Sequence, residues 1–146
     1  MKKSAIIVAG LFVALQTAFA GDVITHDAKQ LPQAARNFIS LHFADRQLSY
    51  IKIDSEITGK KYEVTFTDRT EIEFDSKGGW TQVDCERSSV PEVLVPAFIR
   101  EYVDANYAGA LIEKIELERH GATEIELNNG LSLKFDRKGR LTEIDD

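Results

Sequence analysis

The sequence predicts an α+β fold built from two successive units, each with one helix followed by four antiparallel strands. The main observation is that segment 74–84, FDSKGGWTQVD, recurs sixty-one positions later as segment 135–145, FDRKGRLTEID. Apolar residues around both segments alternate with polar ones at a period of two, and stretches with helical spacing precede each set of strands. We interpret the chain as a duplicated module whose units share one sheet, eight strands in all, with both helices on one face.

The first twenty residues have the pattern of a signal peptide. Lys2 and Lys3 precede an apolar stretch over residues 4–15, and Ala18-Phe19-Ala20 forms a small-x-small cleavage pattern. The apolar stretch is shorter than the ~20 residues that a membrane span needs. We therefore expect cleavage after Ala20, a mature chain of residues 21–146, and a periplasmic or secreted location.

The charge balance limits the class of partner. The full sequence has 18 Lys and Arg against 24 Asp and Glu, a net charge of −6, and loss of Lys2 and Lys3 lowers it to −8. This balance disfavours nucleic acids and anionic membranes, because both require positive charge at the contact. It suits a soluble protein, or one whose partner has a basic surface.

The first unit spans residues 21–86. Residues 21–30 form a polar lead-in, either a flexible arm or a short edge segment. Leu31-Pro32 opens a helix, since proline suits the first helical position, and an apolar stripe runs from Ala35 to Phe43. The four strands that follow contain Ile51 and Ile53, then Tyr62, Val64 and Phe66, then Ile72 and Phe74, and finally a strand ending near Cys85.

The second unit spans residues 87–146 and repeats this order. Val90-Pro91 stands fifty-nine positions after Leu31-Pro32, and Ser89 and Glu92 have the spacing of a capping box. Pro96 predicts a kink, or a short helix followed by a longer one. A two-residue insertion near residues 108–110 accounts for the change of offset. Four strands contain Ile115 and Leu117, Ile125 and Leu127, Leu131 to Phe135, and Leu141 and Ile144, with Asn129-Gly130 as the strongest hairpin signal.

The sheet face not covered by helices is the candidate binding surface. Trp80 and Tyr50 would be large aromatics there, residue types enriched in interface hot spots, and the glutamates would attract Lys or Arg on a partner. Two alternatives stay open: the face is an ordinary solvated surface, or Trp80 wraps round an edge and completes the core. The candidate partner-binding residues are Tyr50, Lys52, Glu71, Glu73, Trp80, Gln82, Glu124, Glu126, Leu141 and Glu143.

Residues typical of catalysis or metal binding are poorly spaced. His26, His42 and His120 lack an H-x-x-x-H pattern, and the sequence has no nucleophile or phosphate-binding motif. Asp75 and Asp136 are each expected to cap their own turn, since calcium requires several oxygen ligands. We therefore expect no enzyme activity, cofactor or metal.

The single cysteine, Cys85, excludes an internal disulfide. We interpret it as a small apolar strand residue. A reactive thiol and an intermolecular bridge are the alternatives.

The two F-D-x-K-G-x-[WL]-T-[QE]-[VI]-D segments, together with Leu31-Pro32 and Val90-Pro91, carry a family resemblance. The chain is similar to the PepSY-like, β-lactamase-inhibitor-like proteins exported by Bacteroidetes, over essentially the whole mature chain. The first copy matches fully, whereas the second has Leu141 in place of the tryptophan. The resemblance implies a helix-plus-sheet repeat whose sheet presents a concave protein-binding face, and PepSY domains are associated with restraining peptidases.

The leading hypothesis is an exported, non-catalytic module that binds another exported protein through the sheet face and inhibits or regulates it. One alternative is a periplasmic carrier of a peptide, glycan or lipid held between sheet and helices. That role requires a sizeable apolar pocket, whereas the close apolar patterning indicates a filled core. An enzyme on a similar scaffold is the third alternative and requires inward-facing polar residues.

Overall fold

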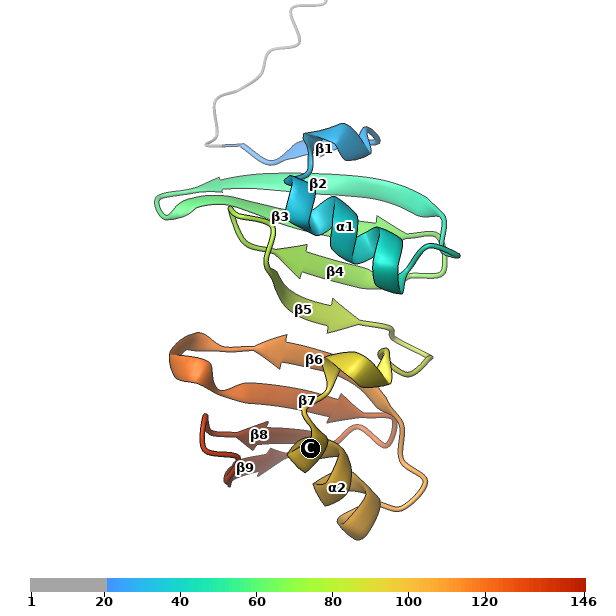
Figure 1. Ribbon diagram of the computed structural model, residues 1–146, viewed down its shortest axis with the longest axis vertical. Helices are drawn as coiled ribbons and strands as arrows, with labels where there is room; N and C mark the ends of the chain where they lie inside the picture. The colour runs from blue at the N-terminus through green and yellow to red at the C-terminus, as the bar shows by residue number, and fades with distance from the viewer. Residues whose placement is uncertain (1–20) are drawn as a thin grey trace, which may run out of the picture.

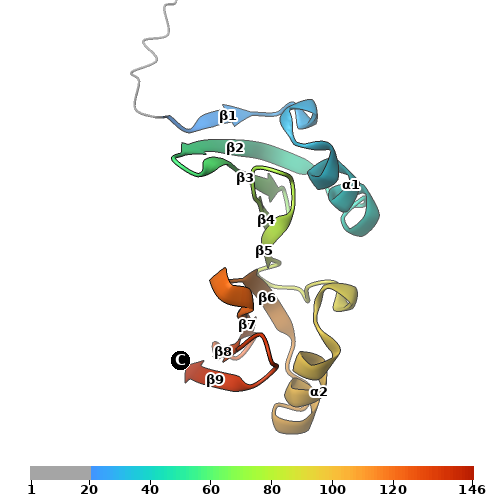
Figure 2. The ribbon, with the colours of Figure 1, turned by 60° about the vertical axis from the view of Figure 1, so that its left-hand side comes forward.

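The computed structural model describes residues 21–146, and the expected signal peptide, residues 1–20, lies outside them. Within the described residues, nine strands form one antiparallel sheet in which each strand pairs with the next along the chain. Two α-helices lie on the same side of this sheet (Figures 1 and 2). The predicted α+β fold with a single antiparallel sheet is therefore confirmed. The strands are β1 Val23–Thr25, β2 Leu48–Glu56, β3 Gly59–Phe66, β4 Glu71–Phe74, β5 Trp80–Asp84, β6 Ile112–Leu117, β7 Thr123–Leu127, β8 Ser132–Phe135 and β9 Leu141–Asp145.

The prediction of eight strands was wrong by one. Part of the polar lead-in forms β1, which pairs with β2 through Val23↔Ile53 and Ile24↔Lys52. Three residues are too few to show an alternation of period two, so the sequence left open whether this segment is a flexible arm or a short edge segment. Backbone hydrogen bonding to β2 makes it an edge strand.

A continuous apolar row joins all parts of the sheet. Seven residues on β2 to β8 lie directly opposite one another on the helix side, and each is at most 1% exposed. The step between the two halves is Val83↔Ile115, where β5 pairs with β6. Burying each such side chain contributes about 1.5–3 kcal/mol. Because the row continues across the β5–β6 pair, the two halves share one core. The row consists of Ile51, Val64, Ile72, Val83, Ile115, Ile125 and Leu133.

Each helix begins directly after a proline. Helix α1, Gln33–His42, follows Pro32, and helix α2, Ala97–Asn106, follows Pro96; both prolines have φ of −53°. The pairing of Pro32 with Pro91 in the two units was therefore wrong, because Pro91 precedes only the short 3-10 turn η2, Glu92–Leu94. The prediction of a short helix before a longer one at Pro96 is confirmed. Ser89 makes no capping hydrogen bond to η2, so the expected capping box does not form.

Each of the recurring Asp-x-Lys-Gly turns lies against one of the helices. The carboxylate Oδ1 of Asp75 accepts hydrogen bonds from the backbone N–H groups of Lys77 and Gly79, both at 2.9 Å. Gly78 has φ of +84°, and a Cβ there would lie 2.8 Å from the backbone nitrogen of Ala35 in α1. The turn therefore requires glycine for its conformation and for its contact with the helix.

The second turn has the same form. Asp136 Oδ1 accepts hydrogen bonds from the backbone N–H groups of Lys138 and Arg140 at 2.9 and 3.0 Å. Gly139 has φ of +81° and faces the ring of Phe98 in α2. The predicted role of Asp75 and Asp136 as turn caps is confirmed.

Candidate binding face of the sheet

The side of the sheet opposite the helices carries two rows of charged and polar residues. Strand register places the members of each row directly opposite one another from β2 to β9. Together the rows hold nine carboxylates and three lysines, so the face is strongly acidic. The first row is Lys52, Glu63, Glu73, Gln82, Glu116, Glu124, Lys134 and Glu143; the second is Tyr50, Thr65, Glu71, Asp84, Lys114, Glu126, Ser132 and Asp145.

Eight of the ten predicted binding residues lie in these rows, and two do not. Trp80 lies opposite Phe74 on the helix side, and its ring stacks on Phe38 of α1 with centroids 6.0 Å apart. Leu141 lies opposite Phe135 and packs against the same core. The placement of Leu141 on the helix-free face was therefore wrong, and of the two alternatives for Trp80 the one found is that it completes the core.

A β-bulge in each half explains the error. Glu73 pairs with Gln82 but Phe74 pairs with Trp80, so Thr81 is an extra residue in β5. The same shift occurs in β9, where Thr142 is the extra residue. An extra residue reverses the alternation of the strand, which moves the preceding side chain to the other face.

Eight members of the two rows were not among the predicted binding residues: Glu63, Thr65, Asp84, Lys114, Glu116, Ser132, Lys134 and Asp145. Asp84 is two residues after Gln82, and Asp145 is two residues after Glu143. The period of two that indicated the other members could have found both aspartates. Thr65 alternates with Glu63 in the same way, but nothing in the sequence marks a threonine as special at this position.

Burial and neighbouring carboxylates both disfavour the charged form of two glutamates on the face. Burial raises the pKa of Glu71, and the negative charges of Glu63, Asp84 and Glu73 raise it further. Burial also raises the pKa of Glu124, with a hydrogen bond to Glu118 as the next cause. A cation placed against the face would relieve this repulsion.

Lysines on the face already neutralise part of its charge. Lys61, two residues before Glu63 on β3, pairs with Glu73 at 2.8 Å, Lys114 lies 3.9 Å from Glu116, and Lys134 pairs with Glu118 at 2.6 Å. Lys52 lies between two aspartates, with its Nζ 3.2 Å from Asp22 and 3.3 Å from Asp54. These pairs are partly exposed, so each contributes little to stability. The remaining carboxylates are the ones that a positively charged partner would meet.

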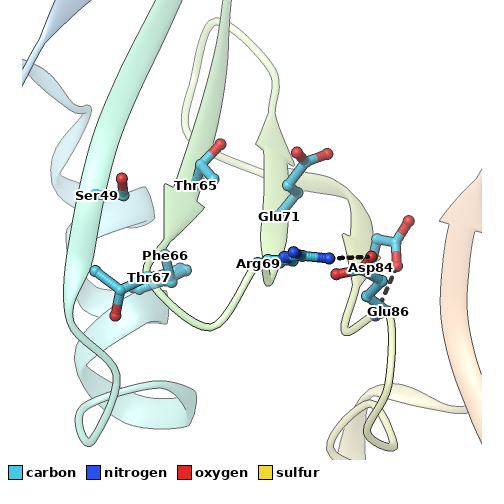
Figure 3. A pocket seen from close by; sticks show the side chains of 8 residues that line it. All are labelled: Ser49, Thr65, Phe66, Thr67, Arg69, Glu71, Asp84 and Glu86. Carbon is cyan, nitrogen blue, oxygen red and sulfur yellow. Dashed lines mark hydrogen bonds and ion pairs between the residues drawn. The ribbon is translucent and has the colours of Figure 1, made fainter.

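The face is hollowed beside the turn between β3 and β4. Figure 3 shows the residues around this hollow, which has a volume of about 570 Å³. Thr65 and Glu71 project from neighbouring strands, while Arg69 extends from the turn toward the end of β5, where its Nη1 lies 3.5 Å from Glu86 Oε1. The hollow is lined by Ser49, Thr65, Phe66, Thr67, Arg69, Glu71, Asp84 and Glu86.

Among residues 21–146, no group of three or more His, Cys, Asp or Glu side chains is placed to hold a metal ion. Cys85 is 2% exposed, and burial raises the pKa of its thiol. Its burial agrees with its interpretation as a small apolar residue, although it lies one residue after the end of β5 and not in a strand. None of the helices formed by these residues has the length and apolar character needed to cross a membrane.

Comparison with known proteins identifies the family. Residues 60–143 match the model of the family described as "Putative beta-lactamase-inhibitor-like, PepSY-like". The chain belongs to this PepSY-like family. The matched segment runs from the start of β3 into β9 and so includes strands from both halves of the sheet.

Three solved structures of similar proteins come from Bacteroides, and each covers 86% of this chain. One is a "putative periplasmic protein of unknown function" from Bacteroides vulgatus, with 41% identity, a TM-score of 0.81 and all of its own chain covered. A second B. vulgatus protein, of the DUF2874 family, has 40% identity and a TM-score of 0.80, with 97% of its chain covered. A "putative calcium-regulated periplasmic protein" from Bacteroides thetaiotaomicron has 42% identity, a TM-score of 0.80 and 97% of its chain covered.

These descriptions place the relatives in the periplasm and name no catalytic activity. No curated protein matches the chain.

Proposed function

We propose that this PepSY-like protein is exported to the periplasm and binds a basic region of another exported protein through its helix-free sheet face. Binding would inhibit or regulate that partner. The observation that carries the proposal is the register of the sheet, which gathers nine carboxylates and three lysines on one face. The periplasmic description of the relatives supports the location.

The electrostatics of the face favour a cationic partner. Burial and neighbouring carboxylates raise the pKa of Glu71 and Glu124, and a cation bound beside them would favour their charged form. Complementary charge across an interface accelerates encounter and selects the partner, and the attraction weakens as salt rises. Tyr50, at the start of the second row, adds an aromatic side chain of a type enriched at interfaces.

The small-ligand alternative has less support. That alternative places the ligand between sheet and helices, where the hollow beside α2, lined by residues that include Val95, Val103 and Leu111, has a volume of about 240 Å³. Ligand pockets are usually about 300–1,000 Å³ in volume. The acidic face is the larger and more distinctive feature, so we favour a protein partner.

The test is capture of a periplasmic protein by two variants with the same change of charge. The first, Glu63→Lys with Glu126→Lys, alters the helix-free face. The control, Glu101→Lys with Asp104→Lys, alters exposed residues of α2 on the other side. We expect wild type and the α2 control to capture the same protein, and the face variant to lose it.

The captured protein is then identified, purified and titrated at increasing salt. We expect the affinity to fall with ionic strength, because complementary charge contributes to binding. Equal loss in both variants, or equal retention, would contradict binding through the sheet face. Ca²⁺ is included as a separate arm, because one relative is described as calcium-regulated and Ca²⁺ prefers carboxylate oxygens.

A further inference from the structure

The hollow beside the β3–β4 turn contains a polar group that the fold leaves unsatisfied. Thr65 is 9% exposed, and its Oγ1 atom has no hydrogen-bond partner among residues 21–146. Most buried side-chain polar groups are hydrogen-bonded, and leaving one without a partner lowers the stability of the protein. Oγ1 itself is covered in this conformation, so it meets an external donor only when the Thr65 side chain rotates about χ1.

Carboxylates, which are negatively charged hydrogen-bond acceptors, lie on the same side of the sheet as this hydroxyl. Glu71 lies directly opposite Thr65, and Asp84 lies directly opposite Glu71 on the next strand. Glu86 closes the same side of the hollow at the end of β5 (Figure 3). The hollow thus combines three carboxylates and the Thr65 hydroxyl with one cation, Arg69, at its rim.

We propose that this hollow receives the side chain of an arginine from the partner protein, with its guanidinium donating to Glu71, Asp84 and Thr65 Oγ1. Guanidinium carries five N–H donors in one plane and no acceptor, which matches a site made of acceptors. A hollow of about 570 Å³ has room for one such side chain. This inference rests on the proposed function and names the point of the face that anchors the partner.

Arg69 is a resident competitor for the same carboxylates. Its side chain is 70% exposed and pairs with Glu86 at 3.5 Å, at the rim of the hollow. The turn that carries it is held by Asp68, which pairs with Arg46 at 2.8 Å and accepts a hydrogen bond from the Thr70 N–H. Removing the Arg69 charge is therefore expected to leave the turn in place and to strengthen binding of an added guanidinium.

The second half of the sheet offers a matched control. Along the same row, Glu126 and Ser132 lie opposite each other as Thr65 and Glu71 do, and Gly130 occupies the turn between their strands. Glu126 is exposed and does not line the hollow. Glu126→Gln therefore removes the same charge from the same face without altering the proposed site.

The experiment titrates the purified protein with acetyl-Gly-Arg-Gly-amide while amide chemical shifts are recorded by NMR. The neutral comparison is the same peptide with citrulline, which keeps the shape of arginine but loses its charge, and a lysine peptide tests the need for a planar donor. We expect the largest shifts at Thr65 and Glu71, with no saturable shift for citrulline and weaker binding of lysine. Glu71→Gln should weaken arginine binding about tenfold, and Glu126→Gln should change it less than about twofold.

Two further variants separate ligand binding from structure. Thr65→Val should raise the urea midpoint, because it removes an unsatisfied buried hydroxyl, and it should weaken arginine binding. Arg69→Gln should tighten binding by about threefold or more. A threonine with a purely structural role would instead lower the urea midpoint when replaced and leave binding unchanged.

The outcomes distinguish this inference from the proposed function. If the arginine peptide binds but Glu71→Gln and Glu126→Gln weaken it equally, the face attracts cations diffusely, and the hollow as an arginine site is overturned. If lysine binds as well as arginine, the specific guanidinium contact is overturned. If arginine and citrulline peptides give the same shifts while the protein partner is still captured through the face, the arginine site alone is overturned. If the partner is not captured either, both proposals are overturned.

Discussion

The two halves of the sheet use the same turn in different ways. In the first half, Gly78 lies against the start of α1. A Cβ added at this position would be 2.8 Å from the Ala35 backbone nitrogen and 2.8 Å from Pro32 Cβ. In the second half, Gly139 faces a side chain, the ring of Phe98, at 3.3 Å. Backbone at the start of a helix has little freedom to move, whereas a ring that is 41% exposed can rotate away. The same sequence motif therefore carries a tighter packing constraint in the first half.

The halves also differ in position and in surface chemistry. β5 pairs with β4 and β6, whereas β9 pairs with β8 at the end of the sheet formed by residues 21–146. The hollow lies in the first half, with Arg69 in its turn, and the corresponding turn of the second half has Gly130. The first half therefore has the closer contact between turn and helix and, under the proposed function, the more specific part of the binding face, while the second half extends the acidic surface.

The largest expected difference between the halves is in their turn glycines. Gly78→Ala should lower the free energy of unfolding by about 3–4 kcal/mol, from a positive φ that alanine disfavours and from overlap with backbone. Gly139→Ala should cost about 1–2 kcal/mol, mainly from the positive φ. Urea unfolding of both variants measures the difference. Equal losses would mean that the contact of Gly78 with α1 is not a constraint.

The second expected difference concerns the residues beside the bulges. Trp80→Ala should lower the free energy of unfolding by about 2–3 kcal/mol, because the indole packs against Phe38 but is partly exposed. Leu141→Ala should cost about 1–2 kcal/mol, since β9 is at an edge and the side chain is smaller.

Partner capture by the folded Trp80→Ala protein is the control for this pair. We expect capture to persist in conditions where the variant remains folded, because Trp80 lies on the helix side. Loss of capture with unchanged stability would show that Trp80 takes part in partner binding.

The smallest expected difference is a dependence on pH. Burial and the charges of Glu63, Asp84, Glu73 and Glu86 raise the pKa of Glu71 above its ordinary value of 4.5. The stability that protonated Glu71 contributes is thus fully present below 4.5 and is lost as pH rises through the higher pKa of the folded state. Glu71→Gln stays neutral, so it should be more stable than wild type above this window and equally stable below it.

The size of this effect is modest because Glu71 is partly exposed to solvent. We expect a gain below about 1 kcal/mol at about pH 7.5 and none at about pH 3.5, measured by urea unfolding. Glu126→Gln is the control in the second half and should stay within about 0.5 kcal/mol of wild type at both pH values. A loss of stability in Glu71→Gln at neutral pH would show that its carboxylate stabilises the folded state.

Local patterns in the sequence were sufficient to predict most of the architecture. Alternation of Ile51 with Ile53, and of Ile72 with Phe74, indicated strands with one buried face, and Pro32 indicated the start of a helix. The repeated Asp-x-Lys-Gly turn predicted the capping by Asp75 and Asp136. These features depend on neighbouring residues in one chain segment, so they can be recognised without knowledge of the fold.

Pairing between segments decided the rest. β1 exists because β2 offers it hydrogen bonds, and the continuous core exists because Val83 lies opposite Ile115. Trp80 lies on the helix side because Thr81 forms a bulge against β4, which is a property of two strands together. The hollow, with the unsatisfied Thr65 hydroxyl, likewise arises only when β2 to β5 lie side by side. The sequence by itself determined the elements and their charges, whereas the tertiary structure decided which side chains share a face, because register is set by contacts between segments distant in sequence.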